Sequence, residues 1–127
     1  MKTLSELKKD DIISYIYPDF EDVYNLFIDT MLIKEISLTT KYIILTTTVL
    51  ETTSPDLTLI DYTQDYFIPK FYHSESCYNN FLFSNEVNDI NLRKMEILSR
   101  RIKTLNKEIR RRKKMLVWPD FYLQKTK

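Results

Sequence analysis

Hydrophobic and polar positions between Phe20 and Met31 recur with the period of a helix. The apolar stripe comprises Phe20, Val23, Tyr24, Phe27, Ile28 and Met31, and the polar side comprises Glu21, Asp22, Asn25 and Asp29. Asp19 directly precedes the stripe and is a favourable N-cap residue. We therefore predict an amphipathic helix that begins near Asp19 and ends at 32–34.

The residues before this helix predict a short N-terminal helical region. Thr3 and Glu6 have the spacing of a capping box, so a helix is expected to start near Leu4. Residues 12–17 fit a helix or a strand equally well, and Pro18 would end either one.

The middle of the chain is rich in β-branched residues, which favour strands. The densest run covers residues 42–50, and shorter runs cover 57–63, 66–72 and 36–39. Because these runs are close in sequence, an antiparallel meander is the most economical arrangement. We expect a small antiparallel sheet of three to four strands, with Pro69 at an edge or at a strand end.

A third pattern, with a heptad period, covers residues 85–117 and predicts one long helix that Pro119 ends. Its a positions are Met95, Ile102, Ile109 and Leu116, and its d positions are Asn91, Leu98, Leu105 and Arg112. Ile at a with Leu at d favours a parallel two-stranded coiled coil. About thirty residues make a helix roughly 45 Å long, so part of it is expected to project or to meet another subunit. The alternative is that this stripe packs on the protein's own sheet.

Together these patterns predict an α+β protein with an N-terminal helical region, a small antiparallel sheet and a long basic amphipathic C-terminal helix. The expected organisation is an acidic α+β body at 1–84, the helix at 85–117 and a tail at 118–127.

Charge divides the chain in the same way. Residues 1–92 hold 6 Lys and Arg against 15 Asp and Glu, a net of −9, whereas residues 93–127 hold 13 against 3, a net of +10. The basic residues expected on the outer surface of the helix are Arg93, Arg100, Lys103, Lys107, Arg110, Arg111, Lys113 and Lys114. Residues 110–114, the basic cluster, place five like charges in just over one turn. Because adjacent like charges repel, an anionic partner explains the cluster better than a solvated face does.

Two anionic partners fit this cluster, the acidic body of a neighbouring copy and a nucleic-acid backbone. The nearly neutral total of +1 favours the protein partner, since the acidic body would repel nucleic acid. The favoured hypothesis is thus a non-enzymatic structural protein that assembles through its C-terminal helix. The alternatives are a nucleic-acid-binding protein that uses the basic helix and a small inhibitor whose acidic body mimics nucleic acid.

The composition excludes several classes of site. The chain has no Gly, whereas roughly nine would be usual at this length, and it has no Ala. Phosphate-binding loops and nucleophile elbows that need Gly are therefore excluded, and Asn or Asp must fill any position with positive φ. The preference for residues with AT-rich codons points to a low-GC genome such as that of a phage. A single Cys and the absence of a signal peptide or membrane span point to a cytoplasmic protein, in a host cell or a virion.

Candidate chemistry is sparse. His73, Glu75 and Cys77 are the only cluster of mixed catalytic types, but too few ligands accompany them for a zinc site. Asp10 with Asp11, and Asp61 with Asp65, lie where turns favour Asp. We predict no catalytic residue, no metal and no cofactor, and hence no enzyme.

An aromatic-rich stretch remains at residues 62–83. It comprises Tyr62, Tyr66, Phe67, Phe71, Tyr72, Tyr78, Phe81 and Phe83. Such rings can stack on single-stranded bases, but only Lys70 interleaves them, so a protein interface is favoured.

Overall fold

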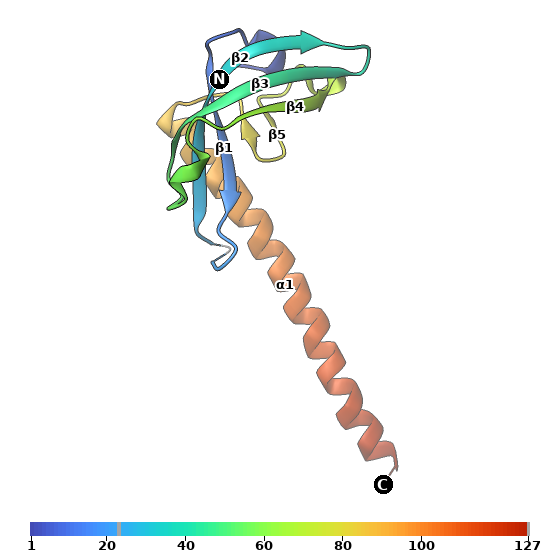
Figure 1. Ribbon diagram of the computed structural model, residues 1–127. Helices are drawn as coiled ribbons and strands as arrows, with labels where there is room; N and C mark the ends of the chain where they lie inside the picture. The colour runs from blue at the N-terminus through green and yellow to red at the C-terminus, as the bar shows by residue number, and fades with distance from the viewer. Residues whose placement is uncertain (23, 127) are drawn as a thin grey trace. The chain divides into compact units, whose positions relative to one another are not determined.

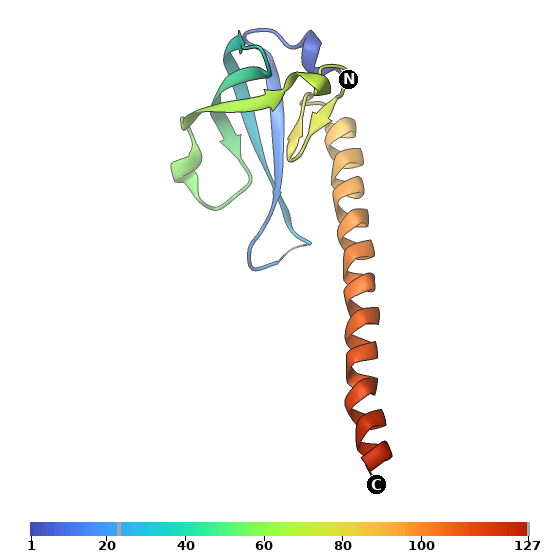
Figure 2. The ribbon, with the colours of Figure 1, turned by 90° about the vertical axis from the view of Figure 1, so that its right-hand side faces the viewer.

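The computed structural model describes residues 1–22 and 24–126, and for residues 116–126 it describes the backbone alone. The chain divides into two compact units, Met1–Lys94 and Met95–Lys127, called here the sheet unit and the helix unit. The sheet unit is built around a curled antiparallel sheet, and the helix unit lies within one long helix (Figures 1 and 2).

The sheet contains six strands in the order β4-β3-β2-β1-β6-β5. They are β1 (Ile12–Pro18), β2 (Leu26–Leu38), β3 (Tyr42–Thr52), β4 (Thr63–Pro69), β5 (Cys77–Tyr78) and β6 (Phe81–Leu82). The first four form a meander, and the chain then returns to the free edge of β1, where Tyr15 pairs with Phe81. Three short 3-10 helices complete the sheet unit: η1 (Leu4–Glu6), η2 (Leu57–Leu59) and η3 (Lys70–Tyr72).

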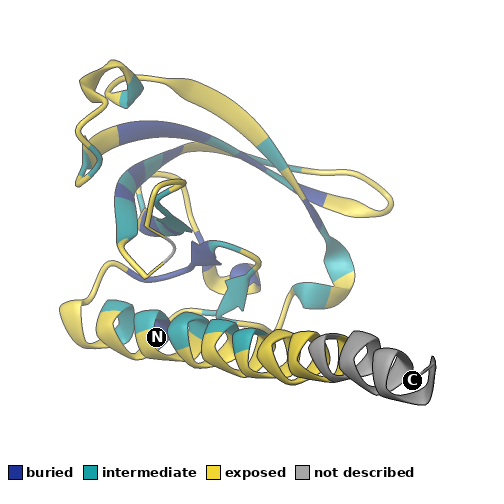
Figure 3. Cartoon of the chain, turned by 90° about the horizontal axis from the view of Figure 1, so that it is seen from below, coloured by how far each residue is buried: buried dark blue, intermediate teal, exposed yellow. Residues whose placement is uncertain are grey.

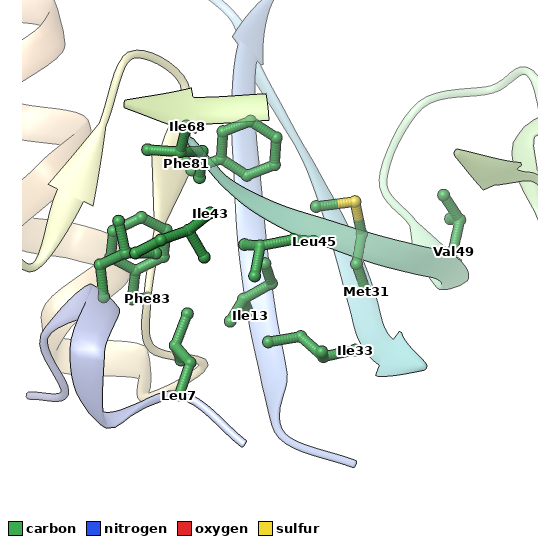
Figure 4. Packing of buried hydrophobic residues seen from close by; sticks show 11 residues of the cluster. Leu7, Ile13, Met31, Ile33, Ile43, Leu45, Val49, Ile68, Phe81 and Phe83 are labelled. Atoms are coloured by element: carbon green, nitrogen blue, oxygen red, sulfur yellow. The ribbon is translucent and has the colours of Figure 1, made fainter. Parts of the chain in front are cut away.

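The main hydrophobic core fills the concave face of the curled sheet (Figure 4). Its buried members are Leu4, Leu7, Ile13, Met31, Ile33, Ile43, Leu45, Val49, Ile68, Phe81 and Phe83. The alternation of side chains along each strand places Ile43, Leu45 and Val49 of β3 on this one face. The same alternation carries Ser14 and Ile16 of β1 to the opposite face, where these two side chains are buried as well.

Aromatic side chains connect strands at opposite sides of the sheet. Tyr66 of β4 and Phe81 of β6 have ring centroids 4.6 Å apart, although three strands separate β4 from β6 in the sheet. Tyr15 of β1 lies 4.9 Å from Phe81 and 6.3 Å from Tyr66. These rings close over the concave face, so the sheet forms half of a barrel.

The predicted helix at 19–34 is wrong, since these residues form a loop followed by β2. Asp29 explains the error, because a helical stripe requires this residue on the solvent side. The structure instead buries Asp29 beside Met31 and Ile33 on the inward face of β2. Hydroxyls from Tyr17 and Thr52 donate to its carboxylate at 2.9 and 2.7 Å, which compensates in part for the loss of water. Val23, a member of the predicted stripe, lies outside the described residues.

The N-terminal helical region is also wrong as predicted. The capping-box residues are used, since the Thr3 backbone N–H donates to Glu6 Oε1 at 3.2 Å, but the helix is only η1. Residues 12–17 belong to β1, and most of 57–63 forms η2 and a turn, with β4 beginning at Thr63. The sheet gains β1, β5 and β6, so it exceeds the predicted three to four strands.

The absence of Gly is accommodated as the sequence predicts. Positive φ occurs at Asp10 (72°), Asp61 (67°) and Asn79 (48°) among the described residues. Asp and Asn tolerate this region best after Gly because their short polar side chains bond locally. These three residues lie in tight turns at the margins of the sheet.

Candidate interaction helix

The long helix α1 (Val87–Thr126) begins within the sheet unit, where side chains anchor its first turns. The hydroxyl of Ser84 donates to Asp89 Oδ2 at 2.7 Å and accepts the Glu86 backbone N–H at 3.1 Å. Asn85 Oδ1 accepts from the Ser14 hydroxyl of β1 at 3.4 Å. The polar residues at 84 and 85 therefore fix the start of the helix to the sheet.

Arg93 is not part of an outer basic surface, contrary to the sequence prediction. It is only 6% exposed, and its guanidinium donates to the Asn79 carbonyl at 2.8 Å. Asn79 has positive φ in the turn between β5 and β6, so Arg93 holds this turn against the first part of α1. Arg93 therefore stabilises the sheet unit.

The apolar residues at the predicted a and d positions from Met95 to Leu116 are called here the heptad seam, and they belong to the helix unit. Met95, Ile102 and Ile109, at a positions, are 64%, 48% and 50% exposed. Leu98 and Leu105, at d positions, are half-buried. The side chain of Leu116, the last predicted a position, lies outside the described residues. Figure 3 colours much of this part of α1 as exposed. The large apolar residues Met95, Ile102 and Ile109 are among these exposed positions.

The predicted anion-binding residues are all exposed on the helix unit. They are Arg100, Lys103, Lys107, Arg110, Arg111, Lys113 and Lys114. The helix continues through Pro119 to Thr126, twelve residues beyond Lys114, whereas the sequence predicts an end before Pro119. A helix dipole stabilises cations only within the last turn, so it does not stabilise the basic cluster at 110–114. The helix dipole therefore offers no compensation for the five adjacent positive charges.

The mixed loop at His73, Glu75 and Cys77 makes contacts that hold the N-terminus. The carbonyl of His73 accepts from Ser5 N–H, and that of Glu75 accepts from Leu4 N–H, both at 2.9 Å. Cys77 is half-buried in β5. Within residues 1–22 and 24–126, no group of three or more His, Cys, Asp and Glu side chains is placed to hold a metal ion.

The paired aspartates are likewise engaged in local structure. Asp11 pairs with Lys2 at 2.9 Å, and Asp65 accepts from the Thr46 hydroxyl of β3 at 2.6 Å. Asp10 and Asp61 occupy two of the positive-φ positions. All four have structural uses in the part of the chain that the structure describes.

Burial perturbs two tyrosines beside Asp29. It raises the pKa of Tyr66 to about 12, with the charges of Tyr15 and Asp29 acting in the same direction. It also raises the pKa of Tyr17, whose hydroxyl donates to Asp29. The neutral tyrosines are therefore favoured in the folded sheet unit.

The aromatic-rich stretch divides between the core and the surface. Phe81 and Phe83 are buried, and Tyr66, Tyr72 and Tyr78 pack against the core. Tyr62, Phe67 and Phe71 are 54%, 56% and 73% exposed. Only the exposed rings remain available for a partner.

One feature was missed by sequence reasoning. A shallow cleft of about 360 Å³ is lined by Lys41, Tyr42, Pro69, Lys70 and Phe71, next to the exposed Phe67. Lys41 is distant from Lys70 in sequence, but Tyr42 pairs with Pro69 across β3 and β4. The predicted meander did not contain this signal, because it placed a strand at 57–63 beside residues 42–50, whereas the structure pairs β3 directly with β4.

Among the described residues, no helix has the length and apolar character needed to cross a membrane. Comparisons with protein-family models, with curated proteins and with solved structures find no match to this chain.

Proposed function

We propose that this chain is a non-enzymatic assembly protein whose copies associate through the helix unit. The observation that carries the proposal is the exposed apolar seam at Met95, Ile102 and Ile109. Isolated helices are marginally stable in water, and most helices are stabilised by packing an apolar face. A second copy of the same seam supplies that packing.

A parallel two-stranded coiled coil fits the residues of the seam. Ile at a with Leu at d packs well in this geometry. The flanking g-to-e′ pairs between copies are Lys94–Ser99, Arg101–Asn106 and Glu108–Lys113. None of these pairs is repulsive and one is attractive. The seam is short, so we expect a dimer that dissociates on dilution.

Charge supports a second contact between copies. The acidic residues lie mainly in the sheet unit, and the basic cluster lies in the helix unit. Opposite charges on two copies attract one another, and this attraction weakens with salt. Assembly of a phage particle is the setting that the composition suggests.

Sedimentation of the full chain tests the proposal. The Ile102→Asp/Ile109→Asp variant places charges in the seam and should be monomeric where the wild type self-associates. Thr104→Asp adds a carboxylate at an exposed c position, which neither belongs to the seam nor flanks it, and serves as the control. A wild type that stays monomeric at high micromolar concentration, with no co-purifying protein partner, would contradict the proposal. Unfolding of the sheet unit in the seam variant would show that the seam serves the protein's own fold.

Nucleic-acid binding by the helix is the second candidate. The observation that favours it is that all five residues of the basic cluster are exposed, well before the helix end. Lys and Arg that neutralise phosphates release counterions and give strongly salt-dependent binding. The salt dependence of nucleic-acid affinity therefore distinguishes this candidate from self-association.

A further inference from the structure

Two lysines in the acidic sheet unit are brought together by the fold. The Lys70 backbone N–H, at the start of η3, donates to the Lys41 carbonyl in the β2–β3 turn at 2.9 Å. In Figure 1 the end of β4 and the β2–β3 turn lie at the same end of the sheet. Neither lysine side chain forms an ion pair within the described residues. No carboxylate belongs to the lining of the cleft between them.

Three exposed aromatic rings lie at or next to this cleft, since Tyr42 and Phe71 line it and Phe67 contacts Tyr42. Tyr42 and Phe67 lie in an edge-to-face contact with centroids 6.0 Å apart, and they are 39% and 56% exposed. Phe71, in η3, is 73% exposed. Rings of this size normally contribute to a core or an interface, and here they lie at a cationic cleft. The arrangement combines flat apolar surfaces with positive charge.

We propose that this cleft binds single-stranded nucleic acid, with bases on Tyr42, Phe67 and Phe71 and phosphates on Lys41 and Lys70. Every base has a π-face that stacks on an aromatic ring, and the phosphate that joins two bases seeks a cation. A buried-core role is excluded for Phe67 and Phe71 by their exposure. An acidic peptide would also meet the lysines, but it has no need of three separate rings.

The net negative charge of the sheet unit does not prevent this binding. At about 0.1 M salt the Debye length is ~10 Å, so distant carboxylates are screened. Asp65, the acidic residue of β4, lies two residues before Phe67. Its carboxylate accepts a hydrogen bond from the Thr46 hydroxyl. The cleft is lined by two lysines and no carboxylate, so its own charge attracts a phosphate. The cleft and the basic cluster of the helix unit share no residue, so each can be varied by itself.

The experiment uses the full chain in which Arg110, Arg111, Lys113 and Lys114 are replaced by Gln, so that the helix contributes little. The probe is a fluorescein-labelled oligothymidylate of about twelve nucleotides, and its binding is measured by fluorescence anisotropy at several salt concentrations. Lys41→Gln/Lys70→Gln should weaken binding and flatten the salt slope by about 0.7 for each phosphate that is no longer neutralised. Lys8→Gln/Lys9→Gln removes the same charge from exposed positions elsewhere in the sheet unit and should leave binding unchanged.

The rings are tested separately from the charges. Phe67→Ala/Phe71→Ala should weaken oligothymidylate binding about tenfold or more, because each stacked base contributes substantially. The same variant should bind inorganic polyphosphate, which has no bases, as well as its parent does. Phe20→Ala/Tyr24→Ala removes two exposed rings of the β1–β2 loop and is the control.

Three outcomes would overturn the proposal. The first is no detectable oligothymidylate binding, which would leave the exposed rings as a protein contact. The second is a lysine variant that binds as tightly as Lys8→Gln/Lys9→Gln. The third is a ring variant with unchanged affinity, which would indicate an anion site that ignores the bases. Thermal unfolding of every variant at the parental temperature ensures that affinity alone has changed.

Discussion

The sheet unit and the helix unit use the same kinds of apolar residue in opposite ways. Ile33 and Leu45 are completely buried by strands of their own unit, whereas Ile102 and Ile109 are about half exposed on a single helix. The sheet unit therefore contains the partners that its apolar residues need. The helix unit has none within itself, and this is why we expect its stability and its function to depend on another molecule.

The largest effect should come from the core of the sheet unit. Leu45→Ala should reduce the free energy of unfolding by about 2–5 kcal/mol, because it leaves a cavity at a fully buried site. Leu50→Ala, on the same strand at a site that is 38% exposed, is the matched control. Urea denaturation followed by near-UV circular dichroism measures both. Equal losses of unfolding free energy in the two variants would contradict the assignment of Leu45 to the core.

The buried carboxylate of the sheet unit should give the next effect. Asp29→Ala leaves the hydroxyls of Tyr17 and Thr52 without their acceptor, which should cost about 1–3 kcal/mol of unfolding free energy. Asp29→Asn keeps an acceptor oxygen and should lose less. The same denaturation measurement applies. A loss that is no larger for Ala than for Asn would argue that the hydroxyl contacts contribute little.

Asp29 also shows why part of the fold could not be predicted. A polar residue on the inward face of a strand breaks the alternation and imitates the polar side of a helix. Its burial becomes favourable only through Tyr17 and Thr52, which the sheet brings from two other strands. No pattern local to residues 19–34 contains those contacts.

The C-terminal helix was easier to predict because its signal is local. Heptad spacing and charge are both properties of residues three to four apart, which share a helix face. Arg93 departs from this rule, since only the turn at Asn79 identifies it as a structural residue. The cleft at Lys41 and Lys70 depends on pairing between strands, so it appeared only when the register was known.

Alkaline pH should have a smaller effect, which acts on the stability of the sheet unit through Tyr66. The pKa of Tyr66 is raised from 10.0 to about 12, so the folded state binds its proton more tightly than the unfolded state does. This contribution to stability is complete below pH 10 and is lost as the pH rises toward 12. Relative to Tyr66→Phe, the wild-type sheet unit should therefore become less stable above pH 10. Tyr62→Phe, at a site that is 54% exposed, is the control.

Thermal unfolding at about pH 8 and at about pH 11, monitored on the sheet unit, measures this difference. Below pH 10 the gap between wild type and Tyr66→Phe should not depend on pH. A gap that stays constant to about pH 11 would show that the Tyr66 hydroxyl is hydrated in the folded state.

The smallest effect on folding should come from the basic cluster, although its effect on binding should be clear. Replacing Arg110, Arg111, Lys113 and Lys114 by Gln keeps helix propensity and removes four charges from exposed positions. The free energy of unfolding of the sheet unit should change by less than about 0.5 kcal/mol. Arg112 is kept because it occupies a d position of the seam.

The partner of the cluster decides what else changes in this variant. If the partner is the acidic face of another copy, self-association should weaken mainly at low salt, and sedimentation at two salt concentrations measures this. If the partner is nucleic acid, the logarithm of the affinity should fall less steeply with salt, by roughly 0.7–0.9 for each phosphate that the variant leaves unneutralised. We expect the protein partner, because fifteen Asp and Glu against six Lys and Arg in residues 1–92 provide an acidic surface on every copy. A variant that matches the wild type in both measurements would show that these charges are merely solvated, and the helix unit would then act through its apolar seam alone.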